Sequence, residues 1–85
     1  DDMGDQLRQV TDALRVAGVT VADIADRSGS SLQDVSAELA GRRPMSLHTV
    51  EAIRNFAGTD LAVEVQAMAG RARSEYLEEV QAGRL

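Results

Sequence analysis

The spacing of glycines constrains the fold of this chain more than any other feature of its sequence. Four of them follow segments of helical periodicity: Gly18, Gly29, Gly41 and Gly58. Before the first of these, apolar residues recur three or four positions apart at Leu7, Val10 and Leu14. Glycine commonly ends a helix because it adopts the left-handed conformation without steric cost. No stretch alternates at period two for long enough to form a strand, so the predicted fold class is all-α.

The pattern predicts five helices. The first spans about residues 3–17, the second runs from a Thr20 cap to near Gly29, the third from Ser31 to Gly41, the fourth from Ser46 to Gly58, and the fifth from Thr59 or Asp60 to about Ala82. Thr20 with Asp23, and Ser31 with Asp34, have the spacing at which a hydroxyl and a carboxylate cap the start of a helix.

Composition agrees with close-packed helices in one small domain. The chain has 85 residues, of which 44% are hydrophobic, and Phe56 and Tyr76 are its only aromatic residues. A core of Leu, Val, Ile, Ala and Met suits a helical domain better than a sandwich or barrel, which would use β-branched and aromatic runs.

Several classes of protein are excluded or disfavoured. The chain has no cysteine and one histidine, His48, so we expect no disulfide, no metal site and no cofactor. His48 beside Ser46 or Thr49 is the spacing of local helix capping rather than of a catalytic pair, so we expect no enzyme. No apolar run approaches the roughly 18 residues needed to span a bilayer. We expect a cytoplasmic protein, which would associate with the nucleoid if it binds DNA.

Three segments together resemble the Xre-type, phage-repressor-like helix-turn-helix family. VADIADRSG at residues 21–29 resembles the family's second helix and turn glycine, VSAELAGRRP at 35–44 its recognition helix and basic loop, and TVEAIRNFA at 49–57 the helix that follows. The resemblance covers about residues 5–58. It implies a helix-turn-helix domain over residues 1–58 of a compact five-helix fold. The periodicity of residues 59–85 predicts a longer C-terminal helix, for packing or dimerisation.

A physical reason for this spacing stands without the family. A small residue such as Ala25 lets two helices cross closely, and Gly29 allows the chain to turn within a few residues. Ile24, Val35 and Leu39 are expected to meet beneath the crossing. The alternative to the helix-turn-helix fold is a generic helical bundle, since small helical domains of other kinds also use alanine and glycine where two helices meet closely.

The resemblance implies a transcription regulator that binds double-stranded DNA, acting as a dimer. It implies that base edges are read from the third helix, whose matching residues are Leu32, Gln33, Ser36 and Ala37. Gln33 and Ser36 have the groups to hydrogen-bond bases, whereas Leu32 offers apolar contact to a thymine methyl. The phosphate contacts would come from arginines that flank this helix: Arg27, Arg42 and Arg43.

Charge argues against strong DNA binding. The net charge is −5, and residues 1–41 carry eight acids against three arginines, while residues 42–85 carry six of each. Asp34 is interpreted as a helix cap, and Glu38 as an exposed residue that pairs with Arg42 four positions on. The alternative function is a helix-turn-helix protein interaction module that docks through Val21, Leu32 and the C-terminal helix.

The fifth helix carries a narrow apolar stripe at helical spacing: Leu61, Val65, Met68, Ala72, Tyr76 and Val80. We interpret the stripe as a partner interface, for a second copy or another protein. The alternative is that the first half of the helix packs on the core and the second half is solvated.

Overall fold

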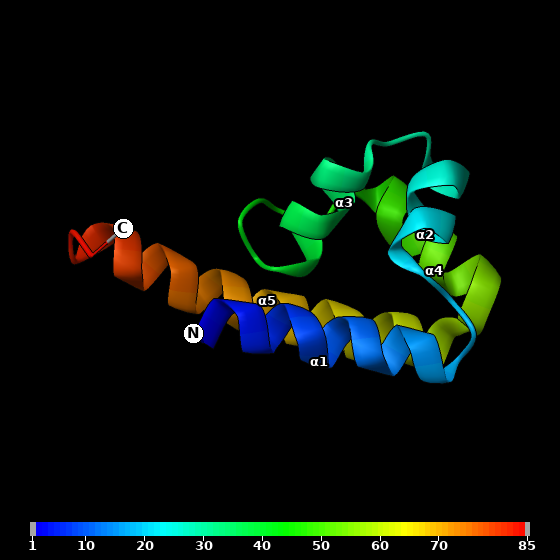
Figure 1. The fold of residues 1–85 in the computed structure, drawn as a ribbon, viewed down its shortest axis with the longest axis horizontal. Helices are drawn as coiled ribbons and strands as arrows, with labels where there is room; N and C mark the ends of the chain where they lie inside the picture. Colours follow the sequence, from blue (N-terminus) through cyan, green and yellow to red (C-terminus); the bar gives the residue numbers. More distant parts are fainter. Residues whose placement is uncertain (1, 85) are drawn as a thin grey trace.

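The computed structural model describes residues 2–84, with side chains from residue 4 onward. Five helices follow one another along the described chain: α1 (Asp2–Val16), α2 (Val21–Ser28), α3 (Leu32–Leu39), α4 (Leu47–Ala57) and α5 (Thr59–Gln81) (Figure 1). The all-α prediction is confirmed, and each observed helix starts and ends within about two residues of its predicted bounds. Residues 1 and 85, the outer ends of the two predicted segments, lie outside the described residues.

The helix starts are capped by the side chains that the sequence indicates. Thr20 and Asp23 form a reciprocal capping box, in which each side chain accepts a hydrogen bond from the other residue's backbone N–H. Ser31 accepts from the backbone N–H of Asp34 at 3.0 Å, and Ser46 accepts from that of Thr49 at 3.2 Å. These bonds satisfy N–H groups that have no partner within the first helical turn.

The helices form two layers. α1 and α5 run side by side in opposite directions, and α2, α3 and α4 lie over α5 (Figure 1). Helices α2 and α3 contact each other, and α2 also packs on α4. The C-terminal end of α5 projects beyond the other helices (Figure 1).

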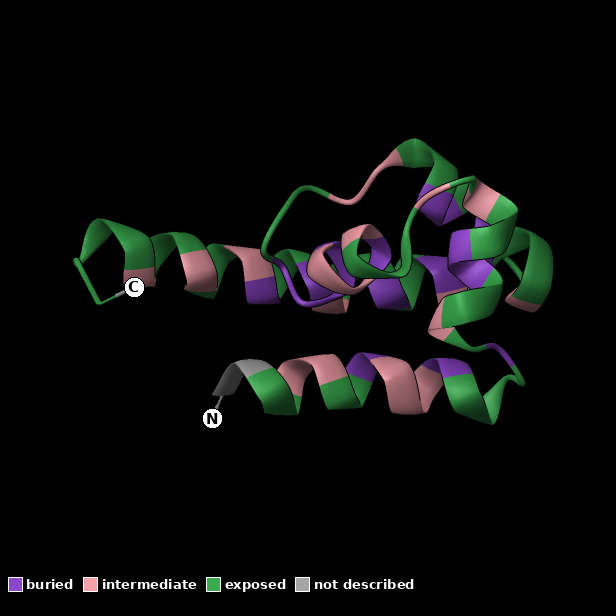
Figure 2. Cartoon of the chain, turned by 45° about the horizontal axis from the view of Figure 1, so that its top comes forward, coloured by how far each residue is buried: buried purple, intermediate pink, exposed green. Residues whose placement is uncertain are grey.

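One hydrophobic core joins the two layers. Its largest side chains with almost no solvent exposure come from all five helices: Val10, Leu14, Ile24, Val35, Leu39, Ile53 and Val65. Figure 2 shows the buried residues on the faces that the helices turn toward one another. Because Ala62 and Val65 of α5 belong to this cluster, the predicted segments 1–58 and 59–85 share one core.

The predicted partner stripe on α5 is therefore partly wrong. Val65 and Ala72 are buried against the rest of the chain, so neither side chain is available to a partner. Leu61, Met68 and Tyr76 are half-buried, and Val80 is exposed. The first half of α5 packs on the core, as the alternative interpretation had it.

Candidate functional site

Helices α2 and α3 meet at a tight corner. The turn between them is residues 29–31, in which Gly29 has φ of 72° and the backbone N–H of Ser30 donates to the carbonyl of Ala25 at 3.0 Å. A positive φ of this size favours glycine. Ile24 and Val35 have no solvent exposure beneath the corner. The two helices contact each other, and the predicted burial of Ile24, Val35 and Leu39 is confirmed.

The four residues predicted to read bases lie on the solvent side of α3. Leu32 and Gln33 are exposed in the first turn, and Ser36 and Ala37 are half-buried one turn later. All four side chains are uncharged. The middle of the outer face of α3 thus carries short, uncharged side chains. Leu32, at the start of the helix, is apolar and 52% exposed.

The predicted exposure of Glu38 is wrong. Glu38 is only 3% exposed, and its carboxylate accepts a hydrogen bond from the backbone N–H of Ser46 at 2.8 Å. Position 38 is three residues after Val35 on the helix, which places both side chains on the inward face. The carboxylate lies at the N-terminus of α4, where the helix dipole favours negative charge. The outer face of α3 consequently lacks one of the two acids assigned to it from the sequence.

The other acid, Asp34, is paired. Its carboxylate accepts a hydrogen bond from Arg43 at 2.7 Å, with both side chains about half exposed. The sequence interpretation gave Asp34 a capping role, and the Ser31 hydroxyl does bond the Asp34 backbone N–H. The Asp34 side chain, however, reaches across to the loop after α3. Arg43, predicted to contact phosphate, is held at the edge of α3 by this pair.

The other two predicted phosphate contacts lie over aromatic rings. The Arg42 guanidinium is 4.8 Å from the centre of the Tyr76 ring, and that of Arg27 is 5.9 Å from the centre of the Phe56 ring. Both arginines are exposed. Such cation–π contacts stabilise a guanidinium over one face of the ring.

The loop after α3 is pressed against α5. Gly41 is buried with φ of 80°, and a Cβ placed on it would lie 2.9 Å from the Cβ of Ala72, and closer still to the backbone of Ala72 and Arg73. Arg73 donates a hydrogen bond to the Gly41 carbonyl at 3.3 Å. The sequence indicated Gly41 only as a helix terminator. Its contact with α5 had no signal in the sequence, because the two positions are far apart along the chain.

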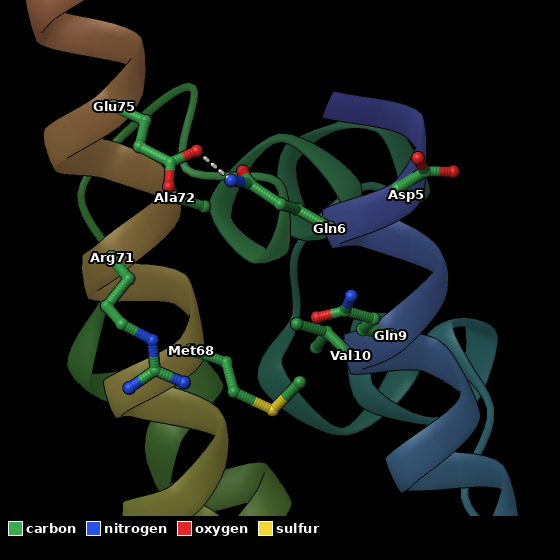
Figure 3. Close-up of a pocket in the computed structure, with 8 residues that line it drawn as sticks. All are labelled: Asp5, Gln6, Gln9, Val10, Met68, Arg71, Ala72 and Glu75. Carbon is green, nitrogen blue, oxygen red and sulfur yellow. Dashed lines mark hydrogen bonds between the residues drawn. The ribbon is translucent and has the colours of Figure 1, made fainter. Parts of the chain in front are cut away.

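A cleft of about 470 Å³ lies between α1 and α5. Its lining combines polar side chains with an apolar floor: Asp5, Gln6, Gln9, Val10, Met68, Arg71, Ala72 and Glu75 (Figure 3). The Gln6 amide donates a hydrogen bond to the Glu75 carboxylate across the cleft. This bond ties α1 to the same part of α5 that contacts the loop after α3.

An ion pair joins the last turns of α5 to the residues that follow the helix. Arg84 donates to both carboxylate oxygens of Glu79, at 2.7 and 3.0 Å. These hydrogen bonds, with the positive charge of Arg84, lower the pKa of Glu79 below its ordinary value. Both side chains are about half exposed, and the pair lies away from α3.

Two further findings concern other kinds of site. Between residues 2 and 84, no group of three or more His, Cys, Asp or Glu side chains is arranged to hold a metal ion. None of the described helices is both long and apolar enough to cross a membrane.

Comparison of the chain with protein-family models, with curated proteins and with solved structures finds no match. The resemblance to the Xre-type family therefore stays a prediction from the sequence.

Proposed function

We propose that the protein binds double-stranded DNA, with α3 in the major groove, and regulates transcription. The observation that carries the proposal is the inward orientation of Glu38, which leaves the outer face of α3 uncharged at Gln33, Ser36 and Ala37. The short side chains of Ser36 and Ala37 permit close approach to the walls of the groove, whose width admits one helix.

Electrostatics supports this use of the face. Asp34 would repel phosphate, and its pairing with Arg43 reduces that repulsion locally. Arg27, in the last turn of α2, precedes α3 along the chain and Arg42 follows it, and both side chains lie at the surface. With a net charge of −5, affinity has to come from these local cations, so binding should be weak per copy and strongly dependent on salt.

The test is a titration of labelled duplexes, followed by selection from random-sequence DNA. Gln33→Ala should relax the preference for bases at one position and cost about 1–3 kcal/mol there. Arg42→Ala should weaken binding to every sequence and reduce the salt slope by about one.

The matched control is Arg15→Ala, which makes the same change of charge on α1, in the other layer of the fold. It should leave the salt slope as in the wild type. Absence of binding to any duplex at low salt would end the proposal.

We also propose that two copies act together through the projecting end of α5. Leu77 and Val80 are 43% and 44% exposed there, beside the half-buried Tyr76. Two copies on a pseudo-palindromic site would compensate for the weak contacts of each. Sedimentation equilibrium of Val80→Glu should show a smaller mass than the wild type, whereas Val63→Glu, on an exposed part of α5 close to its start, should not.

The second candidate function is a protein interaction module. It is favoured by Leu32, which is exposed at the start of α3, and by Leu47, exposed at the start of α4. Val21, which was assigned to the same docking surface, is half-buried and packs against the core. A partner bound by the wild type, but not by Leu32→Asp, in the absence of any DNA binding would favour this function.

A further inference from the structure

The loop that carries Arg42 and Arg43 contacts α5 at three successive places. Gly41 lies against the backbone at Ala72, its carbonyl accepts from Arg73, and Arg42 covers the ring of Tyr76. We propose that Arg73 and Tyr76 are positioning residues that hold this loop beside α3 in the orientation that contacts DNA. The inference rests on the proposed function, because it assigns the loop's position a role in that binding.

The contact at Gly41 fixes the backbone of the loop. The carbonyls in the last turn of a helix have no partner within the helix, and Arg73 supplies one to Gly41 just beyond that turn. The absence of a side chain at Gly41 is what allows the two backbones to approach so closely. The loop therefore leaves α3 in a direction set by α5.

The contact at Tyr76 fixes a side chain. An arginine has many rotamers, and ordering them on binding DNA costs free energy. Packing the Arg42 guanidinium on the ring orders the side chain in advance, and Glu38 anchors the far end of the loop through Ser46. Binding would then require less ordering of the loop than an unsupported pair of arginines would.

The positioning segment of α5 is itself held from the opposite side. Ala72 lines the cleft between α1 and α5, and Glu75 accepts the Gln6 hydrogen bond across it (Figure 3). Residues 72–76 thus lie between α1 and the loop.

The first test uses the protein without DNA. In NMR spectra, the Arg42 side-chain protons should be shifted by the Tyr76 ring current and should show restricted motion. Tyr76→Phe keeps the ring and should preserve both signals, whereas Tyr76→Leu should abolish the shift and mobilise the side chain. Ser74→Ala, at an exposed position of α5 two residues before Tyr76, is the control and should leave Arg42 unchanged. An Arg42 side chain equally ordered in Tyr76→Leu would overturn the inference.

The second test measures DNA affinity. Tyr76→Leu should bind about two- to tenfold more weakly than the wild type, and Tyr76→Phe should restore most of that loss. If Tyr76→Leu binds DNA with wild-type affinity although its Arg42 is mobile, the positioning role is overturned. The proposed function, DNA binding, would not be affected by that result. If the wild type binds no DNA, the proposed function fails, and the positioning role for that binding fails with it. The NMR result for the loop would still stand as a property of the fold.

Discussion

The Glu38 carboxylate and the Ser46 backbone N–H are hydrogen-bonded at 2.8 Å, which links the end of α3 to the start of α4. The bond lies in a region where Glu38 is almost fully buried. A buried carboxylate needs such partners because desolvation without them is costly. The loop of residues 40–46 is thus held near both ends. Gly41 contacts α5, and Ser46 is bonded to Glu38.

Replacing Glu38 should destabilise the fold, and most strongly where the new side chain has no acceptor for the Ser46 N–H. We expect Glu38→Ala to lower the free energy of unfolding by about 1–3 kcal/mol, because the Ser46 N–H is left without its partner. Glu38→Gln keeps an acceptor oxygen and should cost less. Urea denaturation measures both, with Glu51→Ala, an exposed glutamate on α4, as the control. Equal stability of Glu38→Ala and Glu51→Ala would show that the bond contributes nothing.

Alanine at Gly41 should be worse than alanine at Gly29. Both glycines have positive φ, so each change should cost about 1–2 kcal/mol from backbone conformation alone. A Cβ at Gly29 meets open space, whereas one at Gly41 meets the backbone of α5. We expect a clearly larger fall in the thermal midpoint for Gly41→Ala. Similar thermal midpoints for the two variants would mean that α5 can move away from the added Cβ with little loss of stability.

The capping box of α2 should contribute measurably to stability. Thr20→Ala removes the acceptor for the Asp23 backbone N–H and should cost about 1 kcal/mol. Thr59→Ala makes the same change at the first residue of α5, where no side chain caps the helix. That control should stay within about 0.5 kcal/mol of the wild type. Chemical denaturation of the two variants provides the comparison.

The pair at the end of α5 should produce a local dependence on pH. Arg84 lowers the pKa of Glu79. The stabilising contribution of the pair is therefore present above the ordinary pKa of the carboxyl and is lost as pH falls through the lowered pKa. NMR titration of Glu79 should show a pKa that rises to its ordinary value in Arg84→Gln. Added salt should reduce the difference, since both groups are at the surface. An identical Glu79 titration in wild type and variant would contradict the assignment.

Local features of this fold were predictable from the sequence. The caps at Thr20, Ser31 and Ser46 depend on residues three positions apart, and the helix ends at Gly29 and Gly58 depend on a single residue type. Short-range rules of this kind identify helices without knowledge of how they pack.

The errors arose where packing decides the outcome. The sequence interpretation has Glu38 exposed and paired with Arg42, whereas its spacing from Val35 indicates the inward face on which it lies. The pair of Asp34 with Arg43 spans nine residues, and the contact of Gly41 with α5 spans more than thirty. These depend on how α3 lies against its loop and α5, which periodicity does not report. Periodicity also predicts Val65 as part of a partner interface, because it shows an apolar stripe but not which helices cover that stripe.

The shared core has a consequence for where the chain can be cut. A polypeptide ending at Gly58 would lack Ala62 and Val65, and would expose the apolar surfaces of α1 and α4 that they cover. We therefore expect α1–α4 not to fold stably without α5. Calorimetric melting of the whole chain should show a single cooperative transition in which α5 unfolds together with the corner of α2 and α3.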